Sequence, residues 1–148
     1  MRVLFVCTGN TCRSCMAEAI AMHKAEKLNI HAEFHSAGIY AIKGDAASSN
    51  AVTVMREMGI NLRNHVAMPV SSHIINSSDI ILTMTKGQKA TLSSLFPENA
   101  PKIYTLLEYI GEKGDVMDPF GGDLNTYREC SHKIAAAIDK LIVKLGEC

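Results

Sequence analysis

The feature that most constrains this chain lies near its start, where a short apolar run leads into a polar loop and then into a helical pattern. Residues 2–7 (RVLFVC) predict a buried strand, and residues 8–14 (TGNTCRS) predict a tight loop. Helical spacing of apolar residues begins at Cys15 and Met16. The N–H groups of such a loop converge on one point, and the positive end of the following helix adds to their field. The segment therefore predicts a cradle for an anion.

Two side chains give this cradle a chemical character. We expect Cys7 at its floor and Arg13 at its rim. A field that holds a phosphate also stabilises a thiolate, so Cys7 should ionise easily and act as a nucleophile. The five residues between them are enough to wrap the backbone around a phosphate-sized anion, and a guanidinium fork grips two of its oxygens. Ser14 can donate a hydrogen bond to the Cys7 sulfur and stabilise the thiolate.

The rest of the chain alternates between strand and helix patterns. Further strands are expected at residues 31–37, 79–84 and 102–105, and helices at 16–28, 48–58, 71–76, 86–96, 106–110 and 127–145. This alternation predicts an α/β protein with a parallel sheet and helices on both faces. In such sheets ligands bind at the carboxyl ends of the strands, where the cysteine loop begins. The length of 148 residues and the lack of a linker predict one domain, residues 1–148.

Composition narrows the class of protein. Fifteen basic residues balance fifteen acidic ones, which argues against binding to nucleic acid or to a membrane surface. The sequence contains no run of 18 apolar residues and no signal peptide pattern, so we expect a cytoplasmic protein. Five cysteines, an odd number without an export signal, argue against a disulfide framework. Three of them lie within residues 7–15, which indicates thiol chemistry or metal binding.

Two distant motifs carry a resemblance to a known family. Residues 7–14 (CTGNTCRS), followed by Met16-Ala17-Glu18, resemble the signature of low-molecular-weight protein-tyrosine phosphatases. Asp118-Pro119-Phe120-Gly121 resembles the loop that carries the general acid in that family, and Ser36-Ala37-Gly38 matches another of its segments. The resemblance covers nearly the whole chain. It implies a three-layer fold with a four-stranded parallel sheet and helices on both faces.

The resemblance also implies a mechanism in which a phosphocysteine forms on Cys7 and is then hydrolysed. Arg13 and the loop N–H groups would hold the phosphoryl oxygens, and Asp118 would act as general acid and then as general base. The implied phosphate-binding loop consists of Thr8, Gly9, Asn10, Thr11, Cys12 and Ser14. Asn10, Ser36 and His65 would brace this loop through hydrogen bonds. Neither a metal nor a cofactor is expected, and the implied partners are phosphorylated proteins acted on by a monomer.

Thr11 bears on the identity of the substrate. Tyrosine-directed members of the family usually carry a branched aliphatic residue there, whereas the subgroup resembling protein-arginine phosphatases of Gram-positive bacteria carries threonine. A hydroxyl can contact the polar guanidinium of phosphoarginine, and a site that hydrogen-bonds its substrate discriminates against analogues that cannot reciprocate. Phosphoarginine is therefore the preferred substrate and phosphotyrosine the alternative. Tyr40 and Phe120 are either aromatic walls of the substrate cleft or ordinary half-buried side chains.

The cysteine cluster leaves several alternatives open. Cys12 either fills a small gap as a hydrophobe or forms a reversible disulfide with Cys7, which the resemblance favours. A zinc site would need a second pair of ligands, which the sequence does not supply. Arsenate reductases that share the first motif need further cysteines after the third strand, and residues 80–100 contain none. An inactive phosphate-binding module is a final alternative, although Cys7, Arg13, Ser14 and Asp118 are all present.

Overall fold

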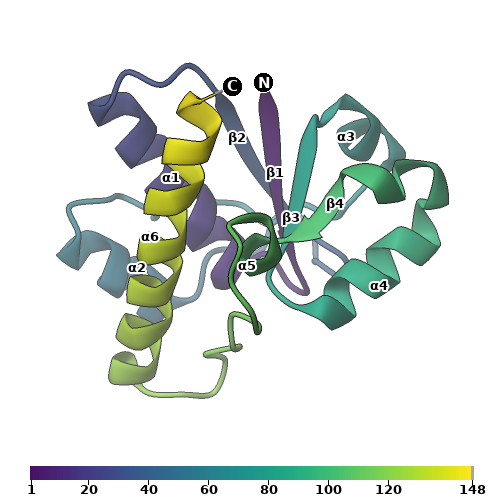
Figure 1. Ribbon diagram of the computed structural model, residues 1–148. Helices are drawn as coiled ribbons and strands as arrows, with labels where there is room; N and C mark the ends of the chain where they lie inside the picture. Colours follow the sequence, from purple (N-terminus) through teal and green to yellow (C-terminus); the bar gives the residue numbers. More distant parts are fainter. Residues whose placement is uncertain (148) are drawn as a thin grey trace.

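A four-stranded parallel sheet forms the centre of the computed structural model, which describes residues 1–147 (Figure 1). The strands are β1 (Arg2–Cys7), β2 (Glu33–Gly38), β3 (Ile80–Thr83) and β4 (Ile103–Thr105), in the spatial order β2-β1-β3-β4. After β1 the chain builds β2 on one side and then crosses to build β3 on the other. The carboxyl end of β1 is therefore a topological switch point, where sheets of this kind bind ligands.

Strand β1 is buried on both faces, which explains its continuous apolar run. Val3 and Phe5 point into one core, and Leu4 and Val6 point into the other. This alternation is the two-residue period of a strand. Because both faces are covered by helices, the strand has no solvent-exposed side, and its end is held rigidly in place.

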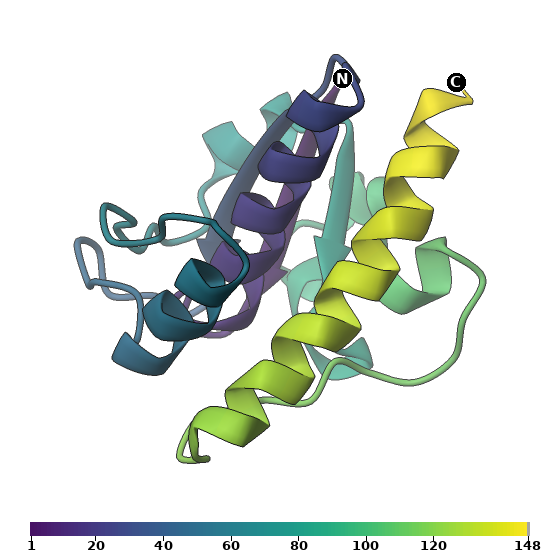
Figure 2. The same cartoon turned by 90° about the vertical axis from the view of Figure 1, so that its left-hand side faces the viewer.

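Helices cover the two faces unequally. On one side, α1 (Arg13–Lys27), α2 (Ser49–Glu57), α5 (Leu106–Tyr109) and the long α6 (Leu124–Gly146) contribute to the larger core. On the other side, α3 (Ser72–Ser77) and α4 (Lys86–Leu95) cover the smaller core. Figures 1 and 2 show α1 and α6 side by side along the sheet. The expected three-layer α/β fold is confirmed. No helix among residues 1–147 has the length and apolar character that crossing a bilayer requires.

Several boundaries differ from the sequence-based expectation. Helix α1 begins at Arg13, two to three residues before the expected start at Cys15 or Met16, because the N–H of Met16 already bonds to the Cys12 carbonyl. Strand β2 begins two residues later than expected. A 3₁₀ helix at Pro97–Lys102 was not anticipated: Pro97 ends α4 but also starts this short turn, a position that suits proline. The earlier start of α1 places Arg13 and Ser14 in its first turn, directly beside the cysteine loop.

Candidate active site

The cysteine loop occupies the gap between the end of β1 at Cys7 and the start of α1 at Arg13. Asn10 in its middle has a φ of 60°, a left-handed backbone that asparagine tolerates better than most residues. The thiol of Cys7 is buried, as are Asn10, Arg13 and Ser14. The local sequence thus forms the turn that the strand-to-helix transition needs, with its polar groups directed inward.

Two groups lie within hydrogen-bonding distance of the Cys7 sulfur. The Ser14 hydroxyl is 2.9 Å from it, and the backbone N–H of Asn10 donates to it over 3.3 Å. The Asn10 side-chain amide donates to the Ser14 oxygen over 2.8 Å. The Ser14 oxygen is thereby an acceptor, and its own hydrogen is directed to the Cys7 sulfur or, at 3.4 Å, to the Ala37 carbonyl. A thiolate at Cys7 would receive both donors.

A second set of bonds braces Asn10 from outside the loop. His65 Nε2 lies 2.7 Å from the Asn10 carbonyl, so that nitrogen carries the proton and donates it. The Met68 N–H donates to Asn10 Oδ1 over 2.9 Å. The structure therefore joins His65 to Asn10, two residues that the family resemblance implied would brace the loop. A segment some 55 residues away in sequence fixes the left-handed turn.

Gly38, at the end of β2, packs directly against the loop. A Cβ atom there would lie 2.7 Å from the Thr8 carbonyl oxygen and 3.0 Å from the Asn10 nitrogen. The two residues after it bond to the same segment, because Ile39 N–H donates to the Cys7 carbonyl and Tyr40 N–H to the Thr8 carbonyl, each over 2.9 Å. Only glycine allows this approach without displacing the loop.

Arg13 and Asp118 meet across the mouth of the loop. The side chain of Arg13 is 6% exposed, and its Nη1 donates to the Val116 carbonyl over 3.0 Å. Its Nη2 lies 3.7 Å from Asp118 Oδ2, and the Asp118 side chain is 54% exposed. The other Asp118 oxygen accepts from the Phe120 N–H over 3.0 Å. One guanidinium thus anchors the loop that carries Asp118, while the carboxyl group stays open to solvent.

The predicted specificity residues lie around this mouth. Thr11 is half-buried, and its hydroxyl lies 3.9 Å from the Cys12 sulfur. Tyr40 and Phe120 are both exposed. An ordinary half-buried role for these two aromatic side chains is therefore wrong, because neither is covered by the fold. Tyr40 lies on the segment after β2, which contacts the loop at Thr8, and Phe120 lies on the segment after Val116, which contacts Arg13.

Cys12 is a buried thiol with two hydroxyl partners. It donates to the Ser48 hydroxyl over 3.5 Å and lies 3.4 Å from the Tyr127 hydroxyl on α6. Burial, together with the Cys12 contact, raises the pKa of Tyr127 to about 12. Burial also raises the pKa of the Cys15 thiol, which keeps it neutral within the core. Cys7, Cys12, Cys15 and Cys130 are free thiols in this structure.

Ser36 does not brace the loop directly. Its hydroxyl donates to Glu18 Oε1 on α1 over 2.7 Å, so the expected hydrogen bond from Ser36 to the loop is wrong. The side chain lies on β2 one strand away from the loop, and the nearest acceptor belongs to the helix that covers this strand. The β2 residues that do reach the site are Ala37, whose carbonyl lies near Ser14, and Gly38, which packs against the loop.

Sequence reasoning missed several residues that support the site. Gln88 on α4 donates to the Thr8 hydroxyl over 3.1 Å, and its own oxygen accepts from the N–H groups of Met84 and Thr85. Tyr127 and the Val116 carbonyl were likewise not anticipated. Thr85 and Gln88 form a capping box, a pattern visible in the sequence, but that pattern does not reveal contact with Thr8. These partners are set by how the elements pack.

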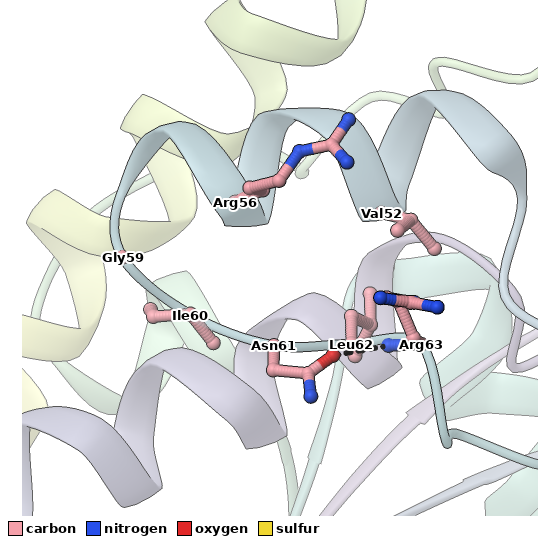
Figure 3. A pocket seen from close by; sticks show the side chains of 7 residues that line it. All are labelled: Val52, Arg56, Gly59, Ile60, Asn61, Leu62 and Arg63. Atoms are coloured by element: carbon pink, nitrogen blue, oxygen red, sulfur yellow. Dashed lines mark hydrogen bonds between the residues drawn. The ribbon is translucent and has the colours of Figure 1, made fainter.

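A separate cavity lies beside the carboxyl end of α2 (Figure 3). It measures about 260 Å³, with Val52, Ile60 and Leu62 as apolar lining and Arg56 and Arg63 at its edges. None of its lining residues belongs to the cysteine loop or to the loop around Asp118.

Within residues 1–147, no three His, Cys, Asp or Glu side chains are grouped in a way that would hold a metal ion. Cys7, Cys12 and Cys15 do not form such a group.

Comparison with known proteins agrees with this geometry. The sequence matches the family described as low molecular weight phosphotyrosine protein phosphatase over residues 2–148. It is 38% identical to a protein-arginine-phosphatase of Bacillus subtilis, over 98% of this chain and 97% of the relative. It is 43% identical to the low molecular weight protein-tyrosine-phosphatase PtpB of Staphylococcus haemolyticus, over 95% of this chain and 97% of the relative.

Solved structures agree as well. The YwlE arginine phosphatase, as a C7S mutant with a phosphorylated active site serine, superposes with a TM-score of 0.97 at 37% identity. The match covers 99% of this chain and 96% of that one. The extent of these matches leaves no large part of either chain unpaired. This chain therefore belongs to the low molecular weight phosphotyrosine protein phosphatase family.

Proposed function

We propose that this enzyme is a cysteine-dependent protein phosphatase that hydrolyses phosphoarginine in proteins. The observation that carries the proposal is the arrangement around Cys7. Its sulfur lies 2.9 Å from the Ser14 hydroxyl, at the base of a loop whose rim holds Arg13 opposite Asp118. A buried nucleophile, an anion-binding guanidinium and an open carboxyl group are the parts that phosphoryl transfer through a covalent intermediate requires.

In the first step, the Cys7 thiolate attacks phosphorus, and the bond from phosphorus to the substrate nitrogen breaks. Asp118 gives its proton to that nitrogen, and the dephosphorylated arginine leaves. Arg13 and the loop N–H groups hold the three non-bridging oxygens as charge redistributes. In the second step, Asp118 takes a proton from water as the water attacks the phosphocysteine. Phosphate is released, and the Ser14 hydroxyl stabilises the returning thiolate.

A covalent intermediate is supported by the relative whose C7S mutant carries a phosphorylated active site serine. In that protein the phosphoryl group is bound to a side chain of the site. We place the equivalent intermediate on Cys7, because its sulfur lies within hydrogen-bonding distance of both the Ser14 hydroxyl and the Asn10 N–H.

The preference for phosphoarginine rests on Thr11 and on the relatives. The Thr11 hydroxyl stands at the half-buried edge of the loop, where it can accept a hydrogen bond from a guanidinium. Relatives named as protein-arginine-phosphatases share 38–39% of their residues with this chain. The second candidate is phosphotyrosine, favoured by the PtpB relative at 43% identity. Tyr40 and Phe120 would flank either leaving group.

The deciding experiment compares turnover of matched phosphoarginine and phosphotyrosine peptides by the wild-type enzyme, with Cys7→Ser as the inactive control. We expect a higher kcat/KM on phosphoarginine. Faster phosphotyrosine turnover would transfer the proposal to the second candidate. Equal rates of p-nitrophenyl phosphate hydrolysis by wild type and Cys7→Ser would rule out the cysteine mechanism, whereas no hydrolysis by the wild type would favour an inactive phosphate-binding module.

We further propose the setting in which the enzyme works. Residues 1–148 act as one catalytic domain, as a monomer in the cytoplasm, on phosphorylated proteins and without metal, cofactor or nucleic acid. The free thiols and the zero net charge support this setting. Oxidation of Cys7 by a peroxide to a sulfenic acid, followed by attack of the Cys12 thiol with loss of water, would give a protective disulfide. A cellular dithiol would then reduce it.

A further inference from the structure

The four most exposed large apolar side chains among residues 1–147 all lie on two segments that flank the cysteine loop. Tyr40 and Ile42 follow β2 and are 71% and 69% exposed, and Met117 and Phe120 flank Asp118 and are 74% and 79% exposed. We call these four residues the apolar rim. Scattered apolar residues are ordinary on a protein surface, whereas a concentration beside a functional site indicates recognition.

Both segments are tied to the site by their backbone. The Tyr40 N–H donates to the Thr8 carbonyl, and the Val116 carbonyl, next to Met117, accepts from Arg13. Figure 2 shows the two segments reaching the carboxyl ends of the strands from different sides. Both segments therefore border the loop that a phosphorylated side chain has to enter in order to reach Cys7.

The fold does not require apolar residues at these positions. In the loop around Asp118, Val116 and Pro119 are buried, while Met117 and Phe120 point outward. After β2, Ile39 packs against the smaller core, while the side chains of Tyr40 and Ile42 are left in solvent. Each segment thus buries the apolar side chains that anchor it and exposes others. The four exposed side chains take no part in either core, and their concentration beside the site points to a contact outside the chain.

We propose that the apolar rim is a docking surface for apolar side chains that flank the phosphorylated residue of the substrate protein. The proposal rests on the proposed function, because the occupant is the polypeptide whose phosphoryl group enters the cysteine loop. Transfer of apolar surface out of water is the driving force. The enzyme thereby selects phosphorylated sites in apolar sequence, which folded proteins expose mainly when they are partly unfolded.

The test uses two phosphoarginine peptides that differ only in the flanking residues, Leu and Val in one and Ser and Gly in the other. We expect the wild type to turn over the apolar peptide with a kcat/KM about tenfold higher. The double variant Ile42→Ser with Met117→Ser removes two of the four rim side chains, so it should reduce this preference at least about threefold. It should keep wild-type turnover of p-nitrophenyl phosphate, which has no flanking residues. The matched control is Leu28→Ser with Val143→Ser. It changes two apolar side chains that are 62% and 61% exposed and lie outside the rim, one at the C-cap of α1 and one in the last turn of α6. It should retain the preference.

Absence of a preference in the wild type, or its persistence in the rim variant, would overturn the docking surface. The same comparison is run with phosphotyrosine peptides. If the enzyme hydrolyses only the phosphotyrosine peptides, the proposed phosphoarginine substrate is contradicted. A preference for the apolar flanks among the phosphotyrosine peptides would still show whether the apolar rim is a docking surface. The two proposals therefore fail separately.

Discussion

At the level of single residues, the environment of the Cys7 sulfur decides whether this protein can perform covalent chemistry. Cys7, Cys12 and Cys15 are all buried thiols within nine residues, yet they have different neighbours. Cys7 faces the Ser14 hydroxyl and a backbone N–H, Cys12 faces two hydroxyl groups, and the Cys15 thiol faces the Cys12 carbonyl over 3.2 Å. Only the neighbours of Cys7 combine a hydroxyl with a loop N–H, which can stabilise both a thiolate and a phosphoryl group bound to that sulfur.

Replacement of Ser14 by alanine tests that arrangement. A hydrogen bond to a charged group contributes about 1.5–3 kcal/mol, so loss of the Ser14 hydroxyl should lower kcat by about tenfold to hundredfold. Steady-state kinetics on p-nitrophenyl phosphate measures this. Ser131→Ala is the control, because Ser131 is equally buried but bonds only within α6, to the Arg128 carbonyl. A Ser14→Ala enzyme with wild-type kcat would contradict the assigned role.

Replacement of Thr11 by isoleucine tests the substrate preference. The branched apolar side chain removes the hydroxyl that a guanidinium can approach, so the ratio of phosphoarginine to phosphotyrosine turnover should fall at least about tenfold. Parallel kcat/KM measurements on matched peptides report the ratio. Thr53→Ile serves as the control, since the Thr53 hydroxyl bonds within α2 to the Ser49 carbonyl. An unchanged ratio in Thr11→Ile would show that specificity lies elsewhere.

At the level of elements, the close contact between the end of β2 and the cysteine loop controls the loop's shape. Substitution of Gly38 by alanine places a Cβ atom 2.7 Å from the Thr8 oxygen. The loop must move, so kcat/KM should fall at least about tenfold and the free energy of unfolding should fall by about 1–3 kcal/mol. Urea denaturation and kinetics measure the two effects.

Gly87→Ala provides the comparison for that experiment. Gly87 lies in the first turn of α4, and a Cβ there would meet nothing closer than the Thr85 oxygen at 3.8 Å. Alanine is the stronger helix former, so this variant should be at least as stable as wild type and fully active. Equal losses in both variants would mean that the Gly38 contact has no special importance.

Most elements could be predicted from the sequence because their patterns are local. The apolar run of β1 and the helical pattern of residues 127–145 within α6 both appear where expected. The start of α1 was misplaced because Arg13 and Ser14 are polar and carry no apolar spacing. Their helical conformation follows from the strand that precedes the loop and from the core under α1, which periodicity cannot report.

At the level of the whole molecule, the last helix supports the first loop. Tyr127 on α6 contacts the Cys12 sulfur, and Arg128 binds both oxygens of Glu57 on α2 through a fork of 2.9 and 2.8 Å. The Arg128 contact lowers the pKa of Glu57. Residues more than 70 positions apart thus fix α2 and α6 around the site.

The raised pKa of Tyr127 makes stability depend on alkaline pH. The neutral phenol is favoured in the folded state, where its pKa is about 12, against an ordinary value of about 10. The folded state therefore binds a proton that the unfolded state has lost, and stability falls as pH rises from about 10 to 12. Urea denaturation across this window should show a smaller decline for Tyr127→Phe than for wild type. Parallel declines would contradict the assigned environment of Tyr127.

The sequence by itself determined the class of chemistry, because the strand, the loop and the start of the helix are contiguous. Cys7, Arg13 and Ser14 lie within eight residues, so a single local turn brings them together, and the loop needs only the end of a strand to hold it. Their grouping follows from short-range geometry and from residue type. The distant Asp118 was assigned a role only through the resemblance of residues 118–121 to a family motif.

Only the tertiary structure decided which groups brace the loop and what surrounds its mouth. The bond from Gln88 to Thr8, the contact of Tyr127 with Cys12 and the redirection of Ser36 to Glu18 all join residues from different elements. No spacing in the sequence encodes such pairs, because they depend on how helices pack against the sheet. The apolar rim has the same origin: which apolar side chains remain exposed is settled only after the core has selected those it buries.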